Sequence, residues 1–208
     1  MSDRSLHRHP GINLTHTDRE AHREAEETVF GFWVFLMSDL VLFALLFATY
    51  AAMIGATDGG PDPRDVFEIG GAALETGVLL LSSLTFGMAS IAMKYDEGPR
   101  RLTLWLGATL LLGLVFLGLE LSDFATMAAQ GAVPSRSGWL SSLYVLLSTH
   151  GLHVAAGCVW IVVMMVQVRV FGMHRAVKLR ILRLGLFWHL LDIVWIGIFS
   201  LVYLGGLA

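Results

Sequence analysis

Five long stretches of this sequence are almost free of charge, and they constrain the fold more than any other feature. Between Glu27 and Asp58 the single charged side chain is Asp39, and between Arg101 and Glu120 there is none. About 20 apolar residues cross the hydrocarbon core of a membrane as a helix. A helix in lipid satisfies its own backbone hydrogen bonds, so these stretches predict transmembrane helices and not strands.

The fold class that follows is an all-α, polytopic membrane bundle of five transmembrane helices. Charged residues make up 15% of the 208 residues, whereas a soluble domain carries about 25%. All five prolines lie outside the apolar stretches, where they do not interrupt a helix. We place the spans at Thr28–Ile54, Gly70–Met93, Leu102–Met127, Trp139–Val168 and Ile181–Leu207.

The positions of lysine and arginine predict the orientation. Twelve of the 14 lie in the N-terminal segment and in the second-to-third and fourth-to-fifth connections, and the other two are Arg64 and Arg136. Basic connections stay on the cytoplasmic side, so we expect the N-terminus inside and the C-terminus outside. Residues 1–27 form a polar, partly disordered cytoplasmic arm in this interpretation, and residues 28–208 form the transmembrane domain.

Ionisable side chains inside the spans are the candidates for function, because they are costly to bury and tend to have a partner. Some of them stand three apart in the sequence and therefore share a helix face, which indicates that these faces contact protein. The ionisable residues of the spans are Asp39, Glu75, Glu120, Asp123, His150, His153, His189 and Asp192.

Three kinds of function are open on these residues alone. Histidines on two helices could hold a haem or a metal ion, although the Glu-x-x-His pairs of carboxylate-bridged metal sites are absent. A file of carboxylates and histidines could carry protons in a transporter, although such proteins show repeated halves and broken helices. The third possibility, favoured by the residues, is that polar groups pair to hold the bundle together. Small residues at Ser83 and Gly87, and at Gly151 and Ala155, predict close helix contacts in support of it.

Three longer elements carry a family resemblance. Phe30–Tyr50 reads FGFWVFLMSDLVLFALLFATY, Thr149–Gly157 reads THGLHVAAG, and Phe187–Trp195 reads FWHLLDIVW. In this order and on these helices they resemble subunit III of the haem–copper respiratory oxidases. The resemblance extends from about Thr28 to the C-terminus.

Further features resemble the bo-type ubiquinol oxidase branch of that family. The sequence has five spans where the long cytochrome c oxidase version has seven. The segments Gly59–Leu81 and Gly118–Phe124 are similar to those of the bo-type enzyme. Asp39 stands where the cytochrome c oxidase pattern has a glutamate.

The resemblance implies a non-catalytic subunit III of a proton-pumping terminal quinol oxidase in the bacterial inner (plasma) membrane. That complex oxidises ubiquinol and reduces dioxygen to water. The resemblance further implies haems and copper in subunit I, no cofactor in this chain, bound phospholipid, and subunits I, II and IV as partners, with no nucleic acid. The alternatives are subunit III of a short-type cytochrome c oxidase, a free-standing proton-coupled transporter, and a haem-carrying membrane anchor.

Under this interpretation the chain has no catalytic, cofactor-binding or metal-binding residues, and its polar side chains make structural, lipid or subunit contacts. One network is expected to join the second, third and fourth spans, and a second group to anchor the fifth. Asp39 is expected to face the bundle or subunit I. The first network comprises Glu75, Glu120, His150 and His153, and the fifth-span anchors are His189 and Asp192.

Overall fold

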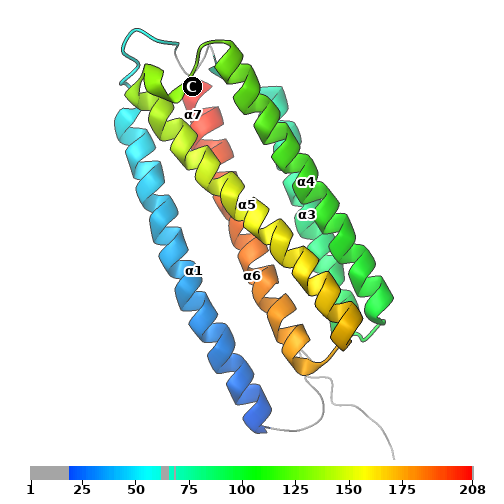
Figure 1. The fold of residues 1–208 in the computed structure, drawn as a ribbon. Coiled ribbons are helices and arrows are strands. Elements are labelled where there is room, and N and C mark those ends of the chain that lie inside the picture. Colours follow the sequence, from blue (N-terminus) through cyan, green and yellow to red (C-terminus); the bar gives the residue numbers. More distant parts are fainter. Residues whose placement is uncertain (1–18, 62–65, 68, 208) are drawn as a thin grey trace, which may run out of the picture.

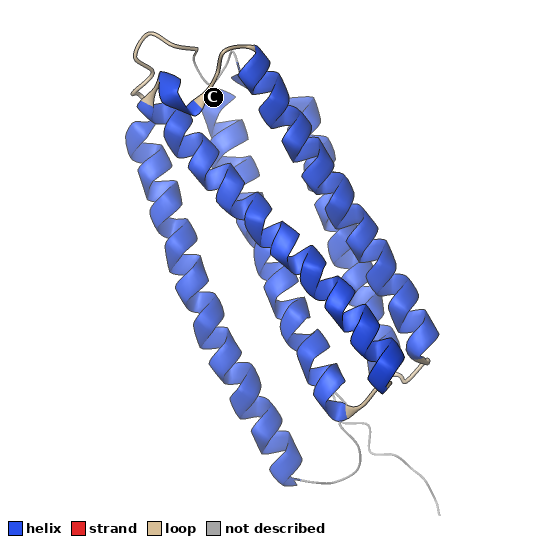
Figure 2. Ribbon diagram, viewed as in Figure 1, coloured by secondary structure: helices blue, strands red, loops and turns tan. Residues whose placement is uncertain are grey.

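A computed structural model describes residues 19–61, 66–67 and 69–207, and all regular structure in these ranges is helical. Five long helices run side by side through the molecule (Figures 1 and 2). All five are long and apolar enough to cross a membrane, so the predicted fold class is confirmed. The long helices are α1 (Arg19–Met53), α3 (Ile69–Lys94), α4 (Pro99–Ala129), α5 (Gly138–Phe171) and α6 (Arg175–Ile198).

Three short elements complete the described fold. A 3-10 turn, η1 (Pro134–Arg136), precedes α5, and a π-helical segment, η2 (Phe199–Leu204), continues α6 into α7 (Gly205–Leu207). Because η2 follows α6 without a break, the fifth apolar span extends over Arg175–Leu204.

The helices extend past the predicted spans at the basic ends. The first begins at Arg19, although its apolar segment is Val29–Met53, and α6 begins at Arg175, where the sequence pattern predicted Ile181. Polar residues continue these helices beyond the apolar part, which the pattern of hydrophobic residues does not register. The remainder of the predicted N-terminal arm, residues 1–18, lies outside the described residues.

Local sequence signals fix where the helices begin and end. Gly98 has a positive φ of 98° before Pro99, the first residue of α4, and proline suits a first helical position because its missing N–H has no helical partner there. The Ser137 hydroxyl accepts a hydrogen bond of 3.2 Å from the Leu140 amide and caps α5. Gly172, with φ 72°, ends α5.

The helices form a four-helix group with α1 at its side. In this group α3 packs on α4, α4 on α5, α5 on α6, and α6 on α3. The first helix packs on α5 and α6 and lies apart from α3 and α4 in Figure 1. Only 11% of the apolar segment of α1 is buried, against 33–56% of the apolar segments of the other four helices. Most of the surface of α1 is therefore available to contact lipid or another chain.

Glycines let aromatic rings enter the helix contacts. A Cβ on Gly113 would lie 2.8 Å from the Trp188 ring, and one on Gly157 would lie 3.0 Å from it. A Cβ on Gly185 would lie 2.7 Å from Phe86. The bundle is therefore held at close range by the small-residue packing that membrane helices use.

Of the two glycines predicted to lie at close helix contacts, one does so and the other does not. Gly151 does lie at a close contact, because a Cβ there would meet the carboxyl group of Glu120. The expectation for Gly87 is wrong, since a Cβ there would meet nothing within 4 Å. The packing face of α3 instead carries Ser82 and Phe86, which are both buried.

Candidate functional site

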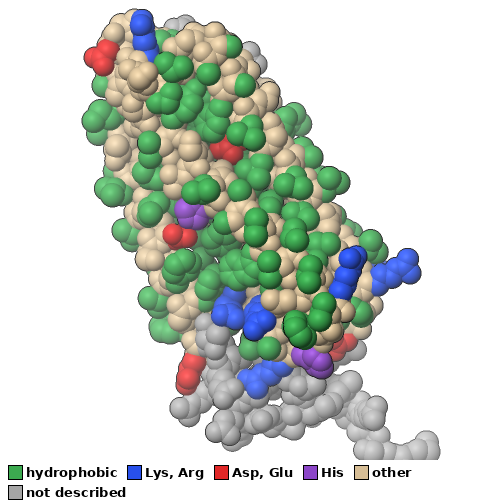
Figure 3. Space-filling view, in the orientation of Figure 1, with side chains coloured by type: hydrophobic (Ala, Val, Ile, Leu, Met, Phe, Trp, Pro, Cys, Tyr) green, Lys and Arg blue, Asp and Glu red, His purple; other side chains and the backbone are tan. Residues whose placement is uncertain are grey.

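Hydrophobic side chains cover the visible face of the molecule along its length, and lysine and arginine gather mainly near its lower end (Figure 3). The few polar groups between the two ends therefore need hydrogen-bonding partners within the protein. Each is described below by the helices that position it.

Asp39 and His153 join α1 to α5. His153 Nε2 lies 3.5 Å from Asp39 Oδ2, and His153 Nδ1 lies 2.7 Å from the Thr149 carbonyl oxygen. Because Nδ1–H donates to that carbonyl oxygen, Nε2 is the ring nitrogen that faces the carboxyl group. The contact gives each of these polar groups a partner on the neighbouring helix, which lowers the cost of burying them in a membrane.

Two buried carboxyl groups meet where α3, α4 and α5 come together. Glu75 is 2% exposed and Glu120 is 6% exposed, and Oε1 of each has no hydrogen-bond partner within the described residues. Glu120 lies against Gly151 of α5, and Asp123 lies near Gly71 of α3, where a Cβ would be 3.7 Å from Oδ2. Because Asp123 acts electrostatically on both glutamates, the three carboxyl groups form one local cluster.

His150 is fully buried among aromatic rings. Its ring centre lies 5.3 Å from that of Trp195, 5.8 Å from that of Phe116 and 6.3 Å from that of Phe43. Neither ring nitrogen has a hydrogen-bond partner in the described part of the chain. The imidazole therefore packs as an aromatic ring at the meeting point of α1, α4, α5 and α6.

His189 lies on α6 beside α3. Its Nδ1 is 3.0 Å from the Ser83 hydroxyl oxygen and 3.4 Å from Asp192 Oδ2. The side chain of His189 is 44% exposed, whereas that of Asp192 is 8% exposed. The ring is thus fixed on its Nδ1 side and open to the surroundings on the other.

Tryptophan side chains of α6 add two hydrogen bonds to α3 that sequence reasoning missed. Trp188 Nε1 donates to Ser82 Oγ at 3.1 Å, and Trp195 Nε1 donates to Thr76 Oγ1 at 3.0 Å. The sequence did contain a signal for a contact face on α6, because Trp188 and Trp195 are seven residues apart and lie on one side of the helix. It gave no signal for the acceptors, because serine and threonine are common in membrane helices.

The predicted four-residue network divides into separate contacts. Glu75 and Glu120 are brought together, but His153 reaches Asp39 of α1, and His150 lies among rings without a polar contact to the glutamates. In the described ranges no group of three or more metal-ligating side chains is arranged to hold an ion. The roles of all these side chains remain predictions.

The sequence of residues 15–207 matches the protein family described as cytochrome c oxidase subunit III. The chain belongs to the cytochrome c oxidase subunit III family. The predicted family resemblance is confirmed, and membership of subunit III implies membership of an oxidase complex.

Relatives of this subunit III are similar over nearly the full length. The chain is 45% identical over 208 residues to cytochrome bo(3) ubiquinol oxidase subunit 3 of Pseudomonas aeruginosa, covering 99% of each chain. It is 45% identical to the protein of the same name from Pseudomonas putida, again over 99% of each. It is 39% identical to cytochrome c oxidase subunit 3 of Bacillus sp. strain PS3, over 92% of each. The five apolar helices and these bacterial relatives identify a multi-pass protein of the bacterial inner membrane.

Proposed function

We propose that this chain is the non-catalytic third subunit of a proton-pumping terminal quinol oxidase. The complex oxidises ubiquinol and reduces dioxygen to water, while this subunit stabilises subunit I and binds lipid. The single observation that carries the proposal is the likeness, over 99% of the chain, to the third subunits of ubiquinol oxidases. A free-standing transporter or haem-carrying anchor has no comparable support.

The polar contacts support a structural role. Asp39 is paired with His153, and His189 with Asp192 and a serine. Each of these contacts involves residues of two helices or of one helix turn, and each reduces the cost of an ionisable group in the membrane. The Asp39–His153 pair joins α1 to α5, and the Ser83–His189 contact joins α3 to α6, so these contacts help to hold the bundle together, which suits an accessory subunit.

The two histidines of α5 do not fit a haem, which supports assigning the haems and copper to subunit I. A histidine that ligates haem iron needs a ring nitrogen facing a slot large enough for the macrocycle. His150 is surrounded by three aromatic rings at 5.3–6.3 Å between centres. Both nitrogens of His153 are already in polar contacts, so neither histidine presents a free nitrogen to such a slot.

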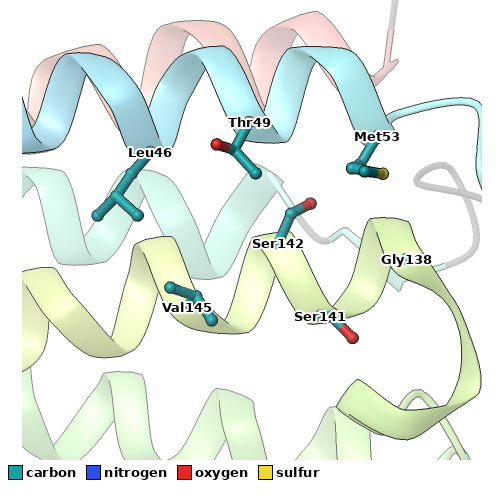
Figure 4. Close-up of a pocket in the computed structure, with 7 residues that line it drawn as sticks. All are labelled: Leu46, Thr49, Met53, Gly138, Ser141, Ser142 and Val145. Carbon is teal, nitrogen blue, oxygen red and sulfur yellow. The ribbon is translucent and has the colours of Figure 1, made fainter.

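A cavity between α1 and α5 suits a lipid acyl chain. It has a volume of about 310 Å³, is open on one side, and has an almost wholly apolar surface (Figure 4). The hydroxyl groups of Thr49, Ser141 and Ser142 all donate to backbone carbonyls near them in sequence, so they do not make the wall polar. The residues that line the cavity are Leu46, Thr49, Met53, Gly138, Ser141, Ser142 and Val145.

The test is to tag this chain, purify it from membranes in mild detergent, and record a reduced-minus-oxidised spectrum. We expect haem signals to arrive with partner chains, namely subunits I, II and IV, and to stay with those partners when this chain is stripped off. A chain that elutes without haem and without partners would overturn the proposal. Phospholipid retained by the stripped chain, measured by mass spectrometry, tests the lipid assignment.

A cytochrome c oxidase is the second candidate, because the relative from Bacillus sp. strain PS3 carries that name. The two candidates differ in electron donor. We expect the purified complex to consume dioxygen with ubiquinol and not with reduced cytochrome c. Activity with cytochrome c alone would place the chain in the other branch.

Substitution of Asp39 tests whether its pair with His153 matters to the complex. Asp39→Leu leaves His153 Nε2 without its partner, so we expect normal expression but weaker retention of this subunit during purification. Asp39→Asn is the matched control, because its amide N–H can still donate to Nε2. Retention and turnover that stay unchanged in the leucine variant would contradict the assigned role.

A further inference from the structure

One face of α6 is a stripe of exposed or half-exposed residues with a single polar member. Successive members are three or four apart, so they lie along one line of the helix. Ile193 is 62% exposed and Ile196 is 45% exposed, and the histidine side chain is 44% exposed. We call this the α6 outer stripe, and it consists of Leu182, Leu186, His189, Ile193 and Ile196.

The α6 outer stripe lies between α1 and α3, on the side of α6 away from α5. Gly197 marks the α1 side, because a Cβ there would lie 3.2 Å from Phe47. Trp188 marks the α3 side through its hydrogen bond to Ser82. In Figure 1, α5 crosses in front of α6.

His189 lies within the apolar part of α6, on the side of its basic end. It is six residues past Arg183, the last basic residue of the helix, and eight past Ile181, where the predicted span begins. Ser83 Oγ and Asp192 Oδ2 both approach Nδ1, and Nε2, on the opposite side of the ring, has no hydrogen-bond partner among the described residues. An ionisable side chain at this depth normally faces the bundle interior or a partner, because lipid tails offer no hydrogen bonds.

We propose that the α6 outer stripe is the docking face for a transmembrane helix of another oxidase subunit, and that this helix forms a hydrogen bond with His189 Nε2. This inference rests on the proposed function, since it needs an oxidase complex. Ser83 and Asp192 occupy the Nδ1 side of the ring, so Nε2 is the nitrogen left for a partner. The partner helix presents a side chain that can hydrogen-bond to Nε2, such as a hydroxyl or an amide, surrounded by apolar side chains that pack on Ile193 and Ile196.

The polar centre of the stripe distinguishes it from the exposed apolar positions of α5. On α5, the exposed positions Leu152, Val159 and Val166 are all apolar, and lipid tails can cover them at no polar cost. On α6, a lipid tail over His189 would leave Nε2 without a hydrogen bond. The chemistry therefore favours a protein helix over lipid at the α6 outer stripe.

Photo-crosslinking in the intact complex tests the proposal. A benzophenone amino acid is placed at Ile193 of the tagged full-length chain, and membranes are irradiated before purification. The same amino acid at Val159, an exposed apolar position of α5, is the control. We expect an adduct between Ile193 and a different oxidase subunit. An Ile193 adduct with lipid alone, or one with a second copy of this chain, overturns the proposal.

His189 variants test the hydrogen bond. Interhelical hydrogen bonds in membranes correspond to about a three- to fifteen-fold change in affinity, so we expect His189→Leu to dissociate from the detergent-purified complex more readily by that factor. His189→Gln, which keeps an acceptor, restores retention. If His189→Leu is retained as tightly as the wild type in a complex that contains haem, the docking inference fails and the proposed function stands. If the wild-type chain carries no haem-containing partners, the proposed function itself fails.

Discussion

A single added methyl group at Gly151 should destabilise the bundle. The carboxyl group of Glu120 lies directly over this glycine, where a new Cβ would be 3.0 Å from both Cδ and Oε1 and nearer still to Oε2. Glu120 is only 6% exposed, so its carboxyl group has no solvent to move into. Overpacking of this kind costs about 1–3 kcal/mol.

Alanine also has a higher helix propensity than glycine, which stabilises the helix by roughly 0.8–1.0 kcal/mol and partly offsets the cost of overpacking. Gly87→Ala is the matched control, because a Cβ there meets nothing within 4 Å and the propensity gain is the same. The difference between the two substitutions isolates the contact. We expect Gly151→Ala to be less stable than Gly87→Ala by about 1–3 kcal/mol.

The assay is unfolding of the purified chain by SDS in mixed micelles, followed by circular dichroism. A double-mutant cycle with Glu120→Ala identifies the partner, because the penalty at Gly151 should vanish once the carboxyl group is gone. Equal stability of Gly151→Ala and Gly87→Ala would refute the reasoning. So would a penalty that persists in the Glu120→Ala background.

Three further substitutions or reactions follow from single contacts. Trp195→Phe loses the hydrogen bond to Thr76 and should lower the free energy of unfolding by about 0.6–1.7 kcal/mol in the same SDS assay. Adding Thr76→Val to that variant should cause no further loss, because the hydrogen bond is already gone. Ser137→Ala removes the cap of α5 and should cost about 0.5–2 kcal/mol, whereas Ser137→Asp should not. The Cys158 thiol is 4% exposed, so maleimide should label it slowly in the native chain and quickly in SDS; equally fast labelling would contradict its burial.

The sequence predicted the spans well because membrane insertion depends on local composition. The second span, predicted at Gly70–Met93, is the helix Ile69–Lys94. The fifth was predicted to begin at Ile181 but begins at Arg175, since a helix continues into the polar interface where hydropathy gives no signal. The orientation of the termini stays a prediction from the positions of lysine and arginine.

Contacts between helices were harder to predict, because they depend on which helices become neighbours. His150 and His153 were expected to share a face, and both rings do pack against Phe43 of α1. Their polar surroundings were not predictable, because a spacing of three residues leaves about a 60° offset around the helix: His153 reaches Asp39, whereas His150 lies among aromatic rings. Nothing in the sequence spacing indicates that α1 lies beside α5, so the pairing required the structure.

The position of α1 beside α5 and α6 has a consequence for biosynthesis. The first helix to enter the membrane packs against the last two to be made, and 100 residues separate the end of α1 at Met53 from His153. At a synthesis rate of about 5–20 residues per second, Asp39 waits roughly 5–20 s for its histidine. During that interval α3 and α4 are made, but neither supplies the histidine that pairs with Asp39, so this carboxyl group stays without its partner until α5 follows.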